Sequence, residues 1–256
     1  MTPSSSERRY YDMAREGGSW DEFPRRDILG YIKARLKAGD AVLDVGCGTA
    51  EILNFISKDV AYVGMEKSEY ALSEARKNWA ARPDTVFADD IFLMKFPALK
   101  FNIILMLFSL EHLKEPRRVL LECLRVLIPG GILVIAAPNL EFPLAWPNAL
   151  RHRSVWFRAG FIFLRLCDYL KRVVGRYSFR LIGENFTEAT GRYEKKDDDL
   201  CHVVSSWEIV RFLEKKGCVL EKFWEERPLT GWRRFVRLLP AMRWYGVILV
   251  AAFRKI

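Results

Sequence analysis

The stretch AVLDVGCGTAEIL, residues 41–53, places an acid, two glycines and a cysteine in one short turn after an apolar run. Because this run is short and bounded by turn residues, we predict a buried strand over residues 41–46. A helix is expected to follow over residues 50–58. Gly46 and Gly48 would let a ligand approach the backbone and the start of that helix.

The turn differs from the two common phosphate-binding turns. The dinucleotide-binding pattern requires a third glycine at the position where Glu51 stands. The P-loop pattern requires a final Gly-Lys-Ser or Gly-Lys-Thr, which this stretch lacks. We therefore expect a ligand that is not held through phosphate groups.

Apolar runs of strand type alternate with amphipathic segments of helix type along the rest of the chain. Strands are expected over residues 41–46, 60–66, 85–89, 101–108, 132–138, 218–227 and 246–256. Helices are expected over residues 25–38, 50–58, 69–80, 117–127 and 205–217, with Ser68 as a cap, a Ser205–Glu208 capping box, and Gly130-Gly131 and Gly217 as stops. This alternation predicts an α/β fold with a doubly wound, mostly parallel sheet.

Length and composition fit one domain over residues 1–256. The chain has 256 residues, of which 50% are hydrophobic, and it contains no internal repeat or low-complexity linker. Within the domain we expect an N-terminal helical cap over residues 1–40 and a basic, aromatic helical insertion, or lid, over residues 139–203. Five cysteines without a CxxC pair, and no apolar run near the roughly 20 residues of a membrane span, favour the cytoplasm.

Acidic residues follow or end three of the expected strands. Asp44 lies in the first strand, Glu66 ends the second, and Asp89 and Asp90 end the third, with Asp90 preferred as the ligand-binding acid. In a parallel sheet these strand ends meet along one edge, where ligands bind. S-adenosylmethionine fits the three acids, because it offers a cationic amino group, a ribose diol that Glu66 can hold through both hydroxyls, and an adenine amino group.

The stretches VLDVGCGTAE, YVGMEKSEYAL, FADDIF, residues 101–139 and HVVSSWEIVRFLEKKGCVLEKF together resemble the class I S-adenosylmethionine-dependent methyltransferases. The resemblance covers residues 41–138 and 202–226, and it is greatest to the group that includes ubiquinone-biosynthesis O-methyltransferases. It implies a Rossmann-like sheet whose last strand is antiparallel. It also implies a set of cofactor-binding residues: Asp44, Gly46, Cys47 and Gly48 at the methionine end, Glu66 and Lys67 at the ribose, Asp90 and Ile91 at the adenine, and Leu107 or Phe108 over the cofactor.

Two further features follow from the resemblance. In related enzymes an N-terminal tyrosine folds over the cofactor carboxylate, so Tyr10 or Tyr11 is expected there, with ordinary packing as the alternative. Cys47 is expected to pack against the cofactor and not to act as a nucleophile.

Methyl transfer from a sulfonium requires alignment of the acceptor and, for some acceptors, removal of a proton. His112 follows the fourth strand and is the candidate general base, whereas its occurrence in relatives with different acceptors favours a structural role in its loop. His152 and His202 flank the insertion, and either could reach the acceptor. No close set of metal ligands is visible, so no metal is expected.

The insertion carries the clue to the acceptor. Residues 150–180 contain eight Lys or Arg and one acid, and residues 227–256 contain seven Lys or Arg and none. Arginines recur every seven residues and form one stripe on a helix whose wider surface is apolar: Arg151, Arg158, Arg165 and Arg172, followed by Arg176. Such a helix is typical of membrane surfaces, whereas an ordinary helix packed on the domain is the alternative.

We therefore expect both basic segments to form a cationic, apolar lid over the acceptor pocket. The expected function is methylation, on oxygen, of a small-molecule, lipid-linked or glycan acceptor. A peripheral contact between residues 150–180 and the inner face of an anionic membrane would accompany it. An RNA methyltransferase, in which the basic and aromatic residues bind nucleic acid, and a non-catalytic S-adenosylmethionine-binding module are the alternatives.

Overall fold

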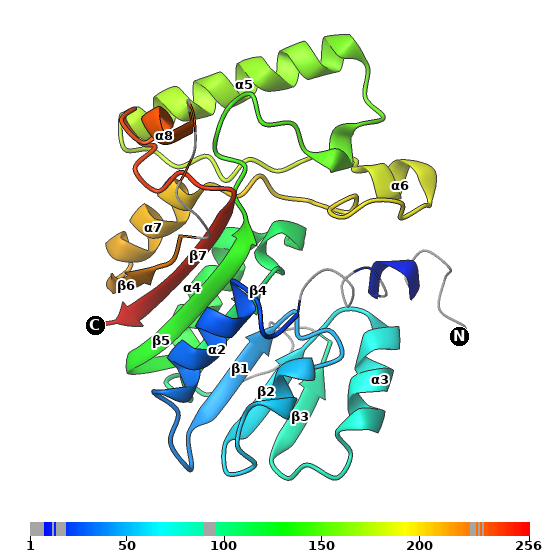
Figure 1. The fold of residues 1–256 in the computed structure, drawn as a ribbon, viewed down its shortest axis with the longest axis vertical. Coiled ribbons are helices and arrows are strands. Elements are labelled where there is room, and N and C mark those ends of the chain that lie inside the picture. Colours follow the sequence, from blue (N-terminus) through cyan, green and yellow to red (C-terminus); the bar gives the residue numbers. More distant parts are fainter. Residues whose placement is uncertain are drawn as a thin grey trace.

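The computed structural model describes residues 8–11, 13, 19–89, 96–225, 229, 231 and 233–256. Within them, seven strands form one sheet in the order β3-β2-β1-β4-β5-β7-β6 (Figure 1). The strands are β1 (Ala41–Val45), β2 (Ala61–Met65), β3 (Thr85–Ala88), β4 (Phe101–Leu107), β5 (Leu127–Pro138), β6 (Cys218–Phe223) and β7 (Ile248–Lys255). Strands β1 to β5 pair in parallel, whereas β7 pairs antiparallel with both β5 and β6. The predicted Rossmann-like, mostly parallel sheet with an antiparallel last strand is confirmed.

Helices cover both faces of this sheet (Figure 1). They are α2 (Arg25–Lys33), η1 (Glu51–Asn54), α3 (Glu69–Asn78), η2 (Leu110–His112), α4 (Pro116–Val126), η3 (Asn148–Leu150), α5 (Val155–Val173), α6 (Phe186–Thr190), α7 (Ser206–Lys215) and α8 (Arg233–Val236). The apolar side chains of α4 and α7 pack on one face, and those of α2, η1 and α3 pack on the other. Strand β4 is therefore buried on both faces, as its continuous apolar sequence predicts.

Two of the predicted helices end earlier than expected. The helix expected over residues 50–58 is a single turn, η1, because the Asn54 side chain donates to the Glu51 carbonyl, which a longer helix would use. Helix α4 ends at Val126, before Gly130-Gly131, and these glycines lie inside β5. A side chain at Gly131 would lie 2.7 Å from the Leu127 side chain, so the pair serves strand packing.

The expected caps are confirmed in part. Ser68 accepts a hydrogen bond from the Ala71 amide, and Ser205 accepts one from the Glu208 amide. However, the Glu208 carboxylate does not return to the start of α7 and accepts instead from the Ser178 and Phe179 amides, at 2.7 and 2.8 Å. Glu208 thus ties the segment after α5 to the domain.

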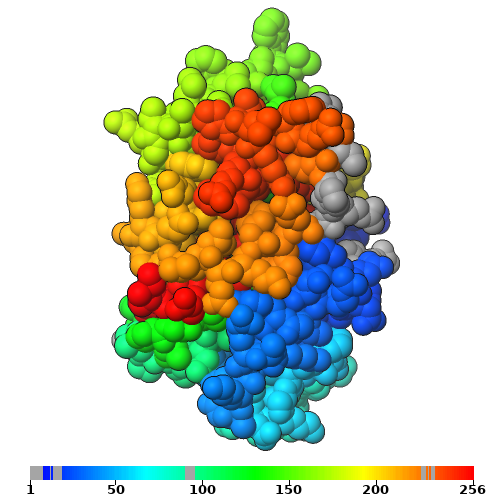
Figure 2. All heavy atoms as spheres, turned by 60° about the vertical axis from the view of Figure 1, so that its left-hand side comes forward, coloured from blue at the N-terminus to red at the C-terminus, as the bar shows by residue number. Residues whose placement is uncertain are grey.

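Helix α5 lies at the end of the molecule toward which β1 and β5 point (Figure 1), and the α8 segment lies beside it (Figures 1 and 2). The predicted arginine stripe exists, but it faces the protein. Arg165 and Arg172 are only 3% and 4% exposed. Arg165 donates to the carbonyls of Leu140, Phe142 and Ala145.

Three of the other four arginines of the stripe also form hydrogen bonds or ion pairs within the protein. Arg172 donates to the Ser205 hydroxyl and the Glu141 carbonyl, at 2.7 and 2.8 Å. Arg151 pairs with Asp198 and Glu194, and Arg158 donates to the Arg151 carbonyl. Arg176, beyond the end of α5, is exposed. None of the described helices is long and apolar enough to cross a membrane.

The buried guanidinium of Arg165 predicts a stability effect. In Arg165→Met, three buried carbonyls lose their donor, so we expect the free energy of unfolding to fall by about 2–4 kcal/mol. Urea denaturation followed by circular dichroism measures this change. Arg176→Met, at an exposed site, is the matched control and should change stability by less than about 0.5 kcal/mol. Equal effects of the two substitutions would contradict the anchoring role.

Candidate active site

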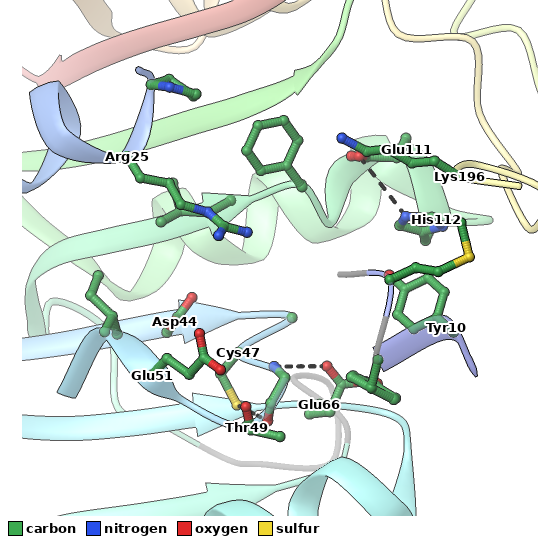
Figure 3. Close-up of a pocket in the computed structure, with 18 of the residues that line it drawn as sticks. Tyr10, Arg25, Asp44, Cys47, Thr49, Glu51, Glu66, Glu111, His112 and Lys196 are labelled. Carbon is green, nitrogen blue, oxygen red and sulfur yellow. Dashed lines mark hydrogen bonds and ion pairs between the residues drawn. The ribbon is translucent and has the colours of Figure 1, made fainter. Parts of the chain in front are cut away.

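A cavity of about 350 Å³ lies at the carboxyl ends of β1, β2 and β4 (Figure 3). Its wall comes mainly from the N-terminal segment with the start of α2, the end of β1 with the turn after it, the segment that follows β4, and a loop between α6 and α7. Glu66, after β2, and Ile248, in β7, complete it. A volume in this range is ordinary for a small-molecule site.

The glycine turn forms the floor of this cavity. The Gly46 and Cys47 amides donate to the Met65 carbonyl at 2.7 and 3.0 Å, which holds the turn against the end of β2. Gly46 has a φ of +80°, and a side chain there would lie 2.3 Å from Ser109 Cβ. Gly48 has a φ of +54° and faces the Tyr11 ring. Only glycine meets both demands at Gly46, so the turn can pack directly against Ser109.

Asp44 and Glu66 lie on either side of this turn (Figure 3). Asp44 is 4% exposed and accepts a hydrogen bond from the Tyr62 hydroxyl at 2.8 Å. Burial raises the pKa of Asp44 to about 7, which the Tyr62 hydrogen bond opposes and the charge of Glu66 increases. A cationic ligand group would relieve the cost of ionising this carboxylate.

The Glu66 carboxylate is oriented by backbone amides. One oxygen accepts from Lys67 and Ser68, at 2.8 and 3.0 Å, and the other accepts from Gly48 at 3.0 Å. A carboxylate offers about four acceptor positions, so three are already used. The expected contact with both ribose hydroxyls therefore requires that one of these amide bonds be given up.

The remaining predicted cofactor residues differ in their placement. Cys47, Leu107, Phe108 and Tyr11 line the cavity, and Tyr10 lines it as well. Lys67 is exposed and meets Glu66 only through its backbone amide. Asp90 and Ile91 lie outside the described residues, and Asp89 is exposed. Burial raises the pKa of the Cys47 thiol well above its ordinary value, which agrees with packing and not with nucleophilic attack.

An acid–base cluster lies across the cavity from the glycine turn (Figure 3). Glu111, in η2, is 1% exposed, and its Oε2 has no hydrogen-bond partner among the described residues. Its Oε1 lies 3.9 Å from His112 Nε2, and His112 Nδ1 lies 3.2 Å from Asp199 Oδ2. The imidazole is thus held between two carboxylates.

The pKa values of this cluster decide the direction of proton transfer. Burial raises the pKa of Glu111 to about 7, and the charge of His112 opposes the shift. Burial would lower the pKa of His112, but Asp199 and Glu111 outweigh it and raise the value to about 9. At neutral pH His112 holds its proton. These pKa values therefore favour Glu111 as the group that can accept a proton.

The other two histidines do not line this cavity. His202 is fully buried, lies against the Phe179 ring, and has a pKa lowered by burial to about 4. His152 packs against Phe186. The expectation that either could reach the acceptor is not supported. Among the described residues, no group of three or more side chains could hold a metal ion.

Several cavity residues were not predicted. Arg25 extends into the cavity from the start of α2, and Tyr193, Lys196 and Asp197 enter from the loop between α6 and α7 (Figure 3 shows Arg25 and Lys196). No residue of 150–180 lines the cavity, so the expectation that the arginine segment covers the pocket is wrong. Tyr193, Lys196 and Asp197, which do line it, belong to the expected insertion over residues 139–203. The arginine stripe is a clear sequence pattern, but it does not mark the cavity wall. Residues 193–199, which contribute to the site, carry no motif that would have identified them.

Comparisons with known proteins find similar sequences among methyltransferases. Residues 43–135 match the family described as "Methyltransferase domain". A ubiquinone biosynthesis O-methyltransferase from Coxiella burnetii is 33% identical over 119 residues, which are 44% of this chain and 50% of that protein. A phosphatidylethanolamine N-methyltransferase from Cereibacter sphaeroides is 33% identical over 122 residues, 46% of this chain and 59% of that protein.

The fold is also shared with a solved structure. An S-adenosylmethionine-dependent methyltransferase from Aquifex aeolicus superposes with a TM-score of 0.53 at 15% identity, covering 93% of this chain and 92% of that one. The matches to the curated relatives span only about half of their length, 50% and 59%.

The sheet order and the family match over residues 43–135 together indicate a Rossmann-like fold of methyltransferase type. Residues 43–135 thus resemble the methyltransferase domain family, for which S-adenosylmethionine is the implied cofactor.

Proposed function

We propose that the chain transfers a methyl group from S-adenosylmethionine to a hydroxyl group of a small amphiphilic acceptor. One observation carries this proposal: a single cavity joins the glycine turn with Asp44 and Glu66 to the cluster of Glu111, His112 and Asp199. A donor site and a proton acceptor are thus close together, as O-methylation requires.

The residues present fit the donor. The buried carboxylate of Asp44 suits the cationic end, and Glu66 suits a ribose hydroxyl through its remaining acceptor position. Gly46 and Gly48 admit close approach, and Arg25 can pair with the methionine carboxylate. When bound, S-adenosylmethionine supplies a methyl group that the sulfonium already activates.

The chain then has to orient the acceptor and take its proton. Glu111 accepts the hydroxyl proton through its unpartnered Oε2, and His112, protonated and paired with Asp199, positions the Glu111 carboxylate. Since His112 stays charged, it also reduces the cost of the ionised Glu111. In this proposal His112 is a positioning residue, and the general base is the neighbouring Glu111.

Aromatic side chains favour a ring-bearing or amphiphilic acceptor. Tyr10 packs edge-to-face with Tyr193, with ring centroids 4.9 Å apart, at the same side of the cavity as His112. The two curated relatives are named for a quinone pathway and for a phospholipid. RNA is the less favoured acceptor, because Arg165 and Arg172 of the predicted stripe are buried and bonded within the protein and cannot contact phosphates.

Donor binding should depend on pH through Asp44. Because its pKa is raised to about 7 in the free protein and a bound cation would lower it, affinity for S-adenosylmethionine should rise about tenfold from pH 6 to pH 8. Titration calorimetry at pH 6, 7 and 8 measures this change. The Asp44→Asn variant is the control, because any pH dependence that it retains comes from titration of S-adenosylmethionine itself. It should bind S-adenosylmethionine weakly and with a smaller pH dependence. An equal dependence in both proteins would contradict the role of Asp44.

The acceptor class is tested by incubating the protein and trideuteromethyl-labelled donor with a cell extract, then separating lipids, polar small molecules and RNA. Mass spectrometry should find the label in one lipid-fraction product as a methyl ether. Label in RNA would overturn the proposed acceptor. No label in any fraction, despite donor binding, would favour a non-catalytic binding module.

A further inference from the structure

Helix α5 turns its apolar side chains to solvent. Trp156, Phe163 and Leu170 are 87%, 64% and 62% exposed. Further exposed apolar residues extend this face along the helix: Val155, Phe157, Leu164, Leu166 and Val173. A helix of 19 residues is about 28 Å long, so this is an extended apolar strip and not a single exposed residue.

The opposite face of α5 prevents the helix from rolling inward. Arg165 and Arg172 are buried and bonded to carbonyls and to Ser205, and Asp168 pairs with Arg180 at 2.7 Å. Rotation that buried the apolar strip would remove all these polar groups from their partners. The exposed apolar face is therefore the stable orientation of α5 on this domain.

The α8 segment extends the same surface. It lies beside α5 at one end of the molecule in both views (Figures 1 and 2). Its Phe235, Leu238 and Leu239 are exposed. We call the exposed apolar residues of α5 together with these three the apolar face.

Exposed cations predominate around the apolar face. Exposed cations adjoin it at Lys171 and Arg176, after α5, and at Arg234 and Arg243, around α8. Asp168 is the only acid in residues 154–176, and it is buried. The exposed acids Glu184 and Glu225 near its two ends are each paired with an arginine, Arg153 and Arg237. An apolar strip with an excess of exposed cations at its rim is complementary to a lipid bilayer with anionic headgroups.

We propose that the apolar face docks on the surface of a bilayer that contains anionic lipids, with α5 lying in the interfacial plane. In this arrangement the apolar side chains of α5, and not the arginine stripe, enter the lipid. The inference does not depend on catalysis and goes beyond the proposed methyl transfer. Docking would bring the end of the molecule toward which the parallel strands point close to the membrane (Figure 1).

Flotation with vesicles tests the proposal. The full chain is mixed with phosphatidylcholine vesicles, with or without phosphatidylglycerol, and bound protein is quantified. We expect binding to anionic vesicles at least tenfold tighter than to neutral ones. The variant Trp156→Ser/Phe163→Ser/Leu170→Ser should lose at least tenfold in affinity, while keeping the wild-type thermal unfolding because the three residues are exposed.

Matched variants identify the source of the binding. Leu121→Ser removes a 43%-exposed leucine from α4, away from the apolar face, and should bind as wild type. Lys171→Glu/Arg176→Glu should weaken binding to anionic vesicles only. The proposal is overturned if the full chain does not float, or if the triple variant floats like wild type. It is also overturned if the apolar face instead forms a dimer, seen by sedimentation, that the triple variant abolishes.

Discussion

The Glu111→Gln variant is expected to bind S-adenosylmethionine normally and to lose about 10²- to 10⁴-fold in kcat, the range that general-base catalysis supplies. The amide has nearly the shape of the carboxylate but cannot accept the acceptor proton. Steady-state kinetics with the acceptor found in the labelling experiment, together with calorimetry of the donor, measures both quantities. Glu115→Gln is the control, because Glu115 is exposed and pairs with Arg118 on the surface. It should leave kcat and the affinity for the donor unchanged.

The pH profile separates Glu111 from His112. If Glu111 is the base, wild-type kcat/KM for the acceptor rises with pH up to about 7, because the carboxyl must be ionised, and this limb is absent in Glu111→Gln. If His112 were the base, the rising limb would lie near pH 9, because the histidine loses its proton only there. A limb near pH 9 that survives in Glu111→Gln would contradict the assignment.

The Gly46→Ala variant is expected to lose about 3 kcal/mol of stability and about 100-fold or more in activity. The new methyl group would lie 2.3 Å from Ser109 Cβ, and alanine would have to adopt a φ of +80°. Ser109 also donates its hydroxyl to the Val45 carbonyl at 2.5 Å, so its movement would displace the segment that carries Glu111 and His112. Donor and acceptor sites are thus expected to be damaged together.

Gly30→Ala supplies the control for this substitution. Gly30 lies inside α2, and a side chain there meets nothing within 4 Å. Because alanine is favoured over glycine in helix interiors, the control should gain about 0.5–1 kcal/mol in unfolding free energy. Wild-type stability and activity in Gly46→Ala would contradict the account of the turn.

The sheet and the donor side of the site follow from local sequence patterns. Strand β4 is apolar on both faces, and β1 ends at a glycine turn, so their types and order could be predicted. Asp44 and Glu66 were predicted together because parallel strand ends meet at one edge, and both line the cavity.

In the acid–base cluster on the other side of the cavity only His112 was predicted, because the rest depends on contacts between distant segments. Asp199 reaches His112 from a loop without a motif, and the raised pKa of Glu111 arises mainly from its burial. The orientation of α5 was likewise hidden. The seven-residue spacing placed Arg165 and Arg172 on one face correctly, but only the carbonyls of residues 140–145 explain why that face lies inward.

The central claim is that one cavity holds the donor against Asp44 and Glu66 and presents its methyl group to Glu111. A crystal structure with S-adenosylhomocysteine tests this most directly. We predict a ribose hydroxyl within hydrogen-bond distance of a Glu66 carboxylate oxygen, with the ligand sulfur facing the Glu111–His112 pair. A ligand bound elsewhere, or one whose sulfur faces away from that pair, would contradict the account.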